Sequence, residues 1–426
     1  MTALPALTQF RLEIDASGVA HLIFDCPGRT MNVFSEAAIT ELRLVADWLG
    51  DADVRGLLIR SGKDNAFCAG ADLTELGVAY DMIVAAPPRA RFGLAFEHFF
   101  RLSAALRALE TAGKPVAAAI AGLALGGGCE LALAAHRRFL VDDPKVAMGL
   151  PESLVGLLPG AGGTQRLPRL VGLERALPIL LDGARLGGAD ALAAGLADVL
   201  VRPGEEVTAA HTWLLSDPTP VQRWDTEEWR APSAAEVATL VGERRAAVMA
   251  STLGHYPAPL AILDCLEFGL PQGFEGAIRS EMATFAELIQ REEPRNMIQT
   301  MFLAKTEFDR LSRKQALPDG LSAVVQAARE AISREDAGTL AAAGFSVADE
   351  TGTPVRPTRG YWLDTDEGAA ARAAVTRISA EVERRVADLS AQERRLADYA
   401  IVREVGFPSY LGGPLTFDER QKRPGL

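Results

Sequence analysis

The most informative stretch of the chain is Leu125-Gly126-Gly127-Gly128-Cys129-Glu130. Further along, the stretch Gly149-Leu150-Pro151-Glu152 ends in a second carboxylate. Three consecutive glycines let backbone N–H groups approach a bound carbonyl without obstruction by side chains. A carboxylate placed just after them can act on atoms close to that carbonyl. Together, these residues predict a site that stabilises an enolate and moves protons or water beside it.

Two further segments place small residues where a predicted strand ends or a helix begins. The first, directly after a predicted strand, is Ala66-Phe67-Cys68-Ala69-Gly70-Ala71-Asp72-Leu73. The second follows Glu152 and runs Gly156-Leu157-Leu158-Pro159-Gly160-Ala161-Gly162-Gly163-Thr164-Gln165-Arg166-Leu167. Such places expose backbone donors, and a helix N-terminus favours negative charge. For Gly160 to Thr164 we prefer a structural turn, with Thr164 capping the next helix, over a phosphate-binding loop.

In their order and spacing, these segments resemble the enoyl-CoA hydratase/isomerase (crotonase) superfamily over residues 9 to about 200. The resemblance implies an α/β fold with a crotonase-type spiral of β-β-α units as its core. The helical pattern beyond residue 204 predicts that a mostly helical C-terminal region follows this core. It also implies an oxyanion hole for a thioester and an acyl-CoA substrate.

The same resemblance assigns roles to individual residues. The N–H groups of Ala71 and Gly127 would form the oxyanion hole, and Glu130 and Glu152 fall on the two catalytic glutamates of the hydratases. Glu152 would deliver a proton to Cα, while Glu130 would orient and deprotonate the water that adds at Cβ. The resemblance assigns contacts with coenzyme A to Ala69, Gly70, Asp72, Leu73 and Gly126.

The presence of both glutamates favours one reaction within the superfamily. Relatives that only isomerise a double bond keep the equivalent of Glu152 and lose the other, whereas hydratases keep both. The leading hypothesis is therefore a lyase, an enoyl-CoA hydratase that adds water to a 2-enoyl-CoA. The alternatives are a Δ3,Δ2-enoyl-CoA isomerase or another crotonase-type acyl-CoA enzyme, and an accessory subunit that docks a separate dehydrogenase or thiolase.

Periodicity in the first 200 residues predicts alternating strands and helices. Two strands are expected within 8–25, around a turn at Asp15 to Gly18. The other strands are expected at 54–60, 115–120 and 138–141. Helices are expected at 35–49 with Ser35 as its cap, at 95–112, from the triple glycine to about His136, and at 164–170, 173–181 and 187–194.

Beyond Val201-Arg202-Pro203-Gly204 the pattern becomes almost entirely helical. Helices are expected at 275–289, 296–308 and 369–403, with a linker at 351–357. Residues 268–310 resemble the helical linker that follows the hydratase part of multifunctional fatty-acid oxidation proteins. The run Glu404-Val405-Gly406-Phe407-Pro408-Ser409-Tyr410-Leu411-Gly412-Gly413-Pro414-Leu415 resembles the end of their 3-hydroxyacyl-CoA dehydrogenase part.

The chain departs from those proteins because the NAD-binding domain is missing. Between Arg310 and Ala369 there is no Gly-x-Gly-x-x-Gly and no room for the βαβ units that bind a dinucleotide. We therefore expect no dehydrogenase activity and no cofactor, with coenzyme A present only as part of the substrate. The predicted domains are a catalytic core at 1–204, a helical extension at 205–310 and a helical C-terminal region at 311–426.

Composition limits the class of partner. A net charge of −12 argues against nucleic acid. The four cysteines and five histidines show no metal-ligand spacing, so no metal is expected. We find neither a secretory signal nor an apolar stretch of roughly 20 residues, and expect a cytoplasmic protein. Its expected partners are an acyl-CoA and either further copies of the chain or a separate β-oxidation enzyme.

Overall fold

The computed structural model describes residues 4–64, 66–347, 366–386 and 389–422. They form two compact units. The first unit comprises residues 1–153, 157–242 and 261–290, and the second comprises residues 154–156, 243–260 and 291–426. The predicted linker at 351–357 lies outside the described residues. The predicted domain boundaries at 204 and 310 stay a prediction, because a compact unit need not be an independently folding domain.

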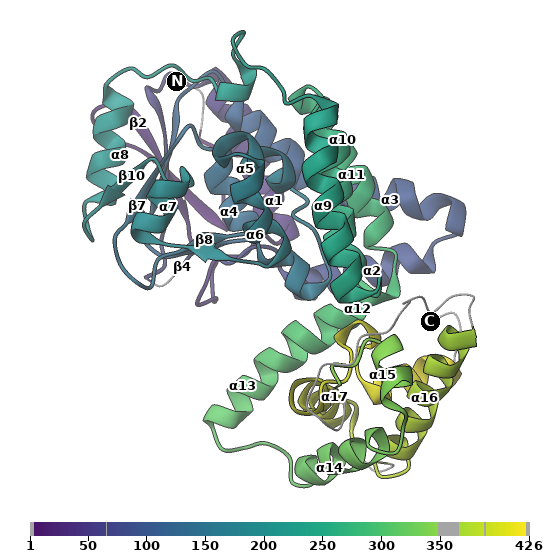
Figure 1. Cartoon of the computed structure of the whole chain (residues 1–426). Helices are drawn as coiled ribbons and strands as arrows, with labels where there is room; N and C mark the ends of the chain where they lie inside the picture. The colour runs from purple at the N-terminus through teal and green to yellow at the C-terminus, as the bar shows by residue number, and fades with distance from the viewer. Residues whose placement is uncertain (1–3, 65, 348–365, 387–388, 423–426) are drawn as a thin grey trace. The chain divides into compact units, whose positions relative to one another are not determined.

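The first unit contains two sheets, both visible in Figure 1. The larger sheet has the strand order β1-β2-β3-β5-β7-β10, in which only the β1–β2 pair is antiparallel. Its strands are β1 (Phe10–Ile14), β2 (Val19–Phe24), β3 (Gly56–Ser61), β5 (Val116–Ile120), β7 (Arg137–Val141) and β10 (Val199–Val201). The smaller sheet consists of β4 (Ala66–Cys68), β6 (Leu123–Leu125), β8 (Met148–Gly149) and β9 (Arg185–Leu186).

Strands alternate between the two sheets as the chain advances. β3, β5 and β7 enter the larger sheet, and each is followed by a short strand, β4, β6 or β8, of the smaller sheet. A helix follows each pair, so the expected spiral of β-β-α units is confirmed. All strands predicted from periodicity are present within a residue or two of their expected bounds.

The helices of this region agree with most of the predicted ones. They are α1 (Glu36–Asp51), α2 (Leu73–Ala85), α3 (Pro88–Glu110), α4 (Gly127–Ala134), the 3-10 helix η1 (Pro151–Val155), α5 (Gly163–Val171), α6 (Leu173–Leu181), α7 (Gly188–Ala194), α8 (Glu206–Leu215) and the 3-10 helix η2 (Arg223–Asp225). The cap of α1 is confirmed, because the Ser35 side chain accepts a hydrogen bond from the Ala38 N–H. The predictions missed α2 and the first residues of α3.

The larger sheet is covered on one face by α8. Ala210 and Leu214 of this helix pack against residues of four strands, including Leu58 and Phe139. These small and branched side chains are fully or almost fully buried, so hydrophobic burial holds the helix to the sheet. Figure 1 shows α8 beside β7 and β10.

Among the described residues beyond Val201, every regular element is a helix, as expected. These are α9 (Ala234–Thr252), α10 (Pro257–Gly269), α11 (Phe274–Leu288), α12 (Glu292–Met297), the π-helix η3 (Ile298–Ala304), α13 (Lys305–Arg313), α14 (Leu321–Ile332), α15 (Ala337–Ala342), α16 (Asp366–Glu383), α17 (Ala391–Val405), the 3-10 helix η4 (Ser409–Leu411) and α18 (Pro414–Lys422). The single helix predicted at 296–308 is instead divided among α12, η3 and α13. None of the described helices is long and apolar enough to cross a membrane.

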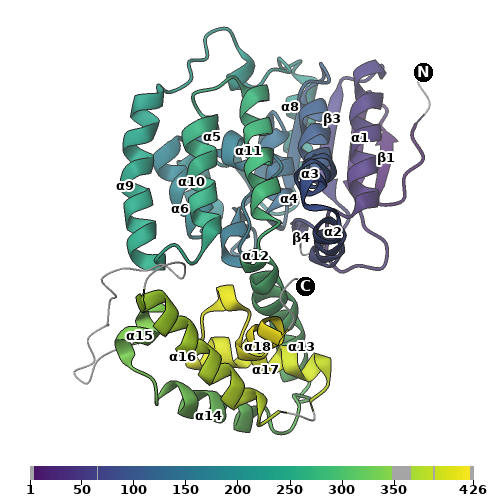
Figure 2. The ribbon, with the colours of Figure 1, turned by 90° about the vertical axis from the view of Figure 1, so that its right-hand side faces the viewer.

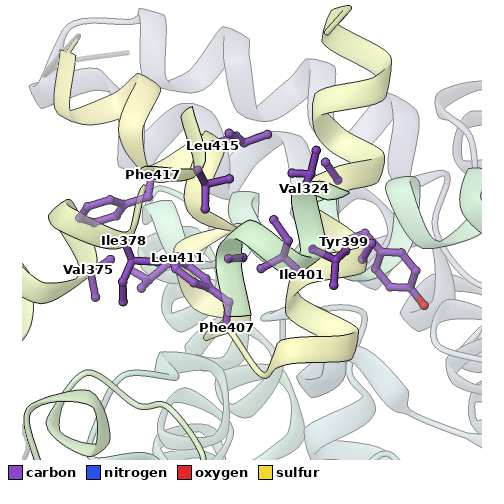
Figure 3. Packing of buried hydrophobic residues seen from close by; sticks show 14 of the residues in the cluster. Val324, Val375, Ile378, Tyr399, Ile401, Phe407, Leu411, Leu415 and Phe417 are labelled. Atoms are coloured by element: carbon purple, nitrogen blue, oxygen red, sulfur yellow. The ribbon is translucent and has the colours of Figure 1, made fainter. Parts of the chain in front are cut away.

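The second unit has its own hydrophobic core. Figure 2 shows α14, α16, α17 and α18 gathered together, and Figure 3 shows the side chains between them. Val324, Ile378, Ile401 and Phe407 are among its members, and each is at most 5% exposed. Burial of these apolar groups accounts for a compact unit that needs no sheet.

The C-terminal run Gly412-Gly413-Pro414-Leu415 is fixed by one buried carboxylate, Asp398 of α17. Its oxygens accept hydrogen bonds from Leu415 N at 2.9 Å, Thr416 N at 2.9 Å and the Thr416 hydroxyl at 2.8 Å. Asp398 therefore caps the start of α18 from a neighbouring helix. Burial raises the pKa of Asp398 to about 7 despite these hydrogen bonds.

We expect Gly413→Ala to destabilise the second unit by about 2–4 kcal/mol. Gly413 has φ +110°, and a Cβ there would lie 2.4 Å from Asp398 Cγ, so both backbone strain and a clash oppose the change. Gly406→Ala is the matched control, because Gly406 also has positive φ but open space around it. That control should lose only about 1–2 kcal/mol. Hydrogen exchange of peptides from α17 and α18 measures both, and equal protection in the two variants would contradict the clash.

Candidate active site

The segments at 66–73 and 125–130, called here the two glycine-containing segments, meet because β4 and β6 pair in parallel. Their register places Cys68 beside Ala124, so both strands end at the same edge of the smaller sheet. A Cβ on Gly70 would lie 3.1 Å from Leu125 O and 3.4 Å from Gly127 N. Gly70 also has φ +102°, which a side chain rarely adopts. Only glycine allows this approach without strain.

Two backbone donors lie at this junction. Ala71 directly follows Gly70, and Gly127 is the first residue of α4. Within the described part of the chain, neither N–H donates a hydrogen bond. The first N–H groups of a helix lack intrahelical acceptors, so the Gly127 N–H is available to a ligand.

A buried asparagine that the sequence analysis missed anchors the Ala71 side of this junction. Asn32 Nδ2 donates to Phe24 O at 2.7 Å and to Phe67 O at 3.1 Å, and Asn32 O accepts from Ala69 N at 2.9 Å. Asn32 is fully buried and ties the ends of β2 and β4 together. Its contacts are distant in sequence, and the only local signal is a polar residue within the turn-rich run that follows β2.

Glu130 lies in the first turn of α4 and is 2% exposed. Its Oε1 accepts two hydrogen bonds, from Ala161 N at 2.7 Å and from Gly163 N at 2.8 Å. No described group donates to its Oε2. Burial raises the pKa of Glu130 to about 7, although the two hydrogen bonds and the charge of Arg166 act to lower it. Near neutral pH this carboxyl group can therefore take up and release a proton.

Glu152 reaches the same place from η1. The parallel pairing of β6 with β8 sets Leu125 beside Gly149, and η1 begins two residues later. A Cβ on Gly126 would lie 3.0 Å from Glu152 Oε1, so this carboxyl group lies over the first of the three glycines. Its Oε2 is sealed from solvent and has no hydrogen-bond partner among the described residues. Burial, reinforced by the charge of Glu130, holds the pKa of Glu152 well above its usual range.

The structure adds a third buried carboxyl group, Glu281 of α11, which the sequence analysis did not single out. Its Oε1 accepts from Gly162 N at 2.6 Å, and its Oε2 accepts from Thr164 N at 3.0 Å and from the Thr164 hydroxyl. The prediction that Thr164 caps the next helix is therefore wrong, because α5 begins at Gly163 with Gly162 as its cap. The N–H groups of this loop are taken by carboxylates, which agrees with the preferred structural role.

The residues assigned to coenzyme A lie around the same edge. Gly70 and Gly126 line the junction, and Ala69 is held by Asn32. Asp72 caps α2 by accepting from Thr74 N at 3.0 Å and Glu75 N at 3.3 Å, and it also pairs with Arg29. Leu73 is the first residue of α2. Contacts of these residues with coenzyme A stay a prediction.

Elsewhere in the first unit, Asp15 binds two histidines. Asp15 Oδ2 lies 2.9 Å from Nε2 of His21 and 2.9 Å from Nε2 of His211. Among the described residues this is the one group of three whose donor atoms could share a metal ion. The distances are those of ordinary hydrogen bonds, and the expectation of a metal-free protein stays a prediction.

The sequence of residues 15–217 matches the enoyl-CoA hydratase/isomerase family. This segment is an enoyl-CoA hydratase/isomerase domain. It contains both glycine-containing segments and both predicted catalytic glutamates. Glu281 lies outside it, although α11 belongs to the same compact unit.

Relatives of the chain include proteins that are named as subunits of a complex. The chain is 36% identical over 300 residues to the fatty acid oxidation complex subunit alpha of Shewanella loihica, which covers 70% of this chain and 41% of that protein. The corresponding subunit of Shewanella baltica is 35% identical over 302 residues, with the same shares covered. The chain thus spans about two-fifths of the length of these curated relatives.

One solved structure supports the fold alone. The enoyl-CoA hydratase from Bacillus halodurans has a TM-score of 0.50 at 18% identity, covering 68% of this chain and 99% of that one. This likeness agrees with the crotonase-type architecture derived above.

Proposed function

We propose that the protein is an enoyl-CoA hydratase, which adds water across the double bond of a 2-enoyl-CoA. The observation that carries the proposal is the pair formed by Glu130 and Glu152 beside two unengaged N–H groups. The two carboxyl groups lie in different hydrogen-bonding environments, which suits them to different roles. The relatives named as fatty acid oxidation subunits make an acyl-CoA thioester the natural substrate class.

In the proposed mechanism, the thioester oxygen binds between the N–H groups of Ala71 and Gly127. Water addition at Cβ moves negative charge onto this oxygen, and donors placed there in advance stabilise it. Removing one such donor costs about 3 kcal/mol of transition-state stabilisation in other enzymes.

The two glutamates then divide the proton transfers. Glu130, ionised, takes one proton from water as the oxygen bonds to Cβ. Glu152, protonated, gives one proton to Cα as the enolate collapses. Substrate gains one H and one OH in total, and the proton left on Glu130 returns to Glu152 directly or through water. The hydrogen bonds to Glu130 Oε1 support an ionised form, whereas the unpartnered Oε2 of Glu152 supports a protonated one.

The direct test is the absorbance of the conjugated enoyl-thioester, which disappears when water adds. We expect it to fall on adding the protein to 2-enoyl-CoA substrates of at least one chain length. An unchanged absorbance with short, medium, long and aromatic acyl groups would overturn the proposal.

Glu130→Gln separates a hydratase from an isomerase. Glutamine keeps an acceptor for Ala161 N and Gly163 N but cannot take a proton from water, so we expect hydration to fall about 10²-fold or more. Isomerisation of a 3-enoyl-CoA needs a single carboxyl group, so any such activity should survive. Steady-state rates with a 2-enoyl-CoA and a 3-enoyl-CoA measure the ratio of hydration to isomerisation in the variant and the wild type.

Glu174→Gln is the control for that experiment, because Glu174 is an exposed residue of α6 in the same domain. It should leave both rates unchanged. Full hydratase activity in Glu130→Gln would exclude Glu130 as the group that takes a proton from water. Turnover of a 3-enoyl-CoA at the wild-type rate by Glu130→Gln, with no hydration by either protein, would favour the isomerase.

The alternative of a docking subunit rests on the name of the relatives, which describes them as parts of a complex. For this alternative, we propose that residues 311–426 form the interface with a separate dehydrogenase or thiolase. This chain itself would bind no NAD. Sedimentation of the full chain with a purified thiolase and dehydrogenase tests this. A cytoplasmic location stays a prediction.

A further inference from the structure

The loop from Ala161 to Thr164 is held by two carboxyl groups in alternation. Glu130 accepts from the N–H groups of Ala161 and Gly163, and Glu281 accepts from those of Gly162 and Thr164. The four consecutive donors therefore point alternately to one carboxyl group and the other. The position of Glu130 is coupled through this loop to Glu281.

Glu281 reaches the loop from outside the hydratase/isomerase domain. It lies on α11, which contacts α3 and α5 of that domain, and its neighbours Ala277, Ile278, Met282 and Phe285 on this helix are also buried. A Cβ on Gly160 would lie 2.8 Å from Phe285 Cδ2, so the same helix also supports the start of the loop. α11 thereby completes the surroundings of the catalytic pair within the first unit.

Positive charge near Glu281 is already engaged elsewhere. Arg166 forms a fully buried ion pair with Glu110, with Nη2 3.0 Å from Oε2. Arg169 donates to Gln165 Oε1 at 2.9 Å and to backbone carbonyls. Among the described residues Glu281 has no ion pair of its own, although it is fully buried. A neutral acceptor would satisfy the same N–H groups, so a charge at this position is not required for packing alone.

We propose that Glu281 is a positioning residue of the active site, which fixes the loop that aims Glu130 and adds a third carboxyl group beside the catalytic pair. The inference rests on the proposed hydratase function, which it deepens. Glu281 does not touch the reacting atoms in this scheme. It acts through the loop and through its electric field.

The charge of Glu281 shifts the pKa of Glu152 in one direction, upward. The titratable or charged groups that interact electrostatically with Glu281 are Glu130, Glu152, Arg166, Arg169 and Cys265. Burial and the charge of Glu130 raise the pKa of Glu281 to about 8, against hydrogen bonds from Thr164 and Gly162. After burial and the charge of Glu130, the charge of Glu281 further raises the pKa of Glu152. Above about pH 8, where Glu281 is ionised, its charge therefore favours the protonated form of Glu152 that donates to Cα.

Two variants separate position from charge. Glu281→Gln keeps the side-chain length and removes the charge, whereas Glu281→Asp keeps the charge and shortens the reach. We expect Glu281→Gln to shift the alkaline limb of the kcat/KM profile to lower pH, because Glu152 then loses its proton more easily. Glu281→Asp should lower kcat by about tenfold through misplacement of Glu130, with KM nearly unchanged and the alkaline limb in place.

Glu287→Gln is the matched control, since Glu287 is an exposed residue of the same helix. It should change neither the pH profile nor kcat. If Glu281→Gln only lowers stability and leaves the shape of the pH profile unchanged, the residue is structural and the proposal is wrong. Unchanged kcat in Glu281→Asp would equally remove the positioning role.

A readout without substrate keeps this test separate from the proposed function. The pKa of Glu281 is about 8 in the folded protein and has its ordinary value of 4.5 in the unfolded chain. Between these two pH values the folded protein holds a proton on Glu281 that the unfolded chain has released. The contribution of Glu281 to the free energy of unfolding therefore falls as the pH rises through this range. Glu281→Gln should flatten that dependence and Glu287→Gln should not. If the wild type is inactive but Glu281→Gln flattens the pH dependence of unfolding, only the hydratase proposal is wrong. If this pH dependence has the same slope in Glu281→Gln and Glu287→Gln, the proposed electrostatic effect of Glu281 is wrong.

Discussion

Replacing Glu152 by glutamine should lower kcat for hydration of a 2-enoyl-CoA by about 10²–10⁴-fold, with little change in KM. Glutamine has nearly the same shape and still fits over Gly126, but it cannot deliver a proton to Cα. The N–H groups of Ala71 and Gly127 remain, so the variant should still bind the thioester and retain some activity. Steady-state kinetics together with calorimetric binding of a saturated acyl-CoA measure the two effects separately.

The pH profile gives this prediction a second readout. Glu130 must be ionised and Glu152 protonated, so the wild type should show a bell-shaped dependence of kcat/KM. Activity should fall as the pH drops below about 7, where Glu130 becomes protonated, and again at high pH, where Glu152 loses its proton. Because the two groups interact, the limbs belong to the pair. In Glu152→Gln the alkaline limb should disappear.

Glu174→Gln serves again as the control, because it removes an exposed carboxyl group of the same domain. A Glu152→Gln variant with wild-type kcat would exclude Glu152 as the proton donor. Loss of acyl-CoA binding at unchanged fold would assign the residue to binding.

Much of this site could be predicted because its signals are local in sequence. Glycines that permit close backbone approach and strands with period-two alternation are visible in short windows. They predicted alternating strands and helices, whereas the β-β-α spiral was implied by the resemblance to the crotonase superfamily. The start of α2 was also signalled locally, by Asp72 with Glu75 three residues later. That signature was assigned to coenzyme A alone, which is why the helix was missed.

Glu281 could not be placed in the site from sequence because its partners are more than a hundred residues away. One signal was available. The helix at 275–289 was predicted, and Glu281 lies four residues from both Ala277 and Phe285 on its apolar face. A carboxyl group on such a face must find buried donors, which periodicity alone cannot identify. Likewise, Thr164 looked like a cap because the carboxylates that take the loop N–H groups were not foreseen.

Gly128→Ala should destabilise the first unit by about 3–5 kcal/mol or prevent it from folding. A Cβ at this position would lie 2.2 Å from Cys68 O and 2.7 Å from Cys68 Cβ, and the first of these is a backbone atom that cannot rotate away. Relief would require β4 and α4 to separate, although β4 is fully buried. Chemical unfolding of the full chain, followed by tryptophan fluorescence, measures the change, because four of its five tryptophans, Trp48, Trp213, Trp224 and Trp229, lie in the first unit.

Gly77→Ala tests whether the clash itself is responsible. Gly77 is also helical, in α2, but nothing lies within 4 Å of a Cβ built there. That substitution should stabilise the helix by up to about 1 kcal/mol, because alanine has the higher helix propensity. If Gly128→Ala has the same free energy of unfolding as the wild type, Cys68 cannot lie as close to Gly128 as the structure indicates. If Gly128→Ala folds but β4 and α4 separate, the N–H groups of Ala71 and Gly127 would move apart, and activity should be lost although Glu130 and Glu152 are both intact.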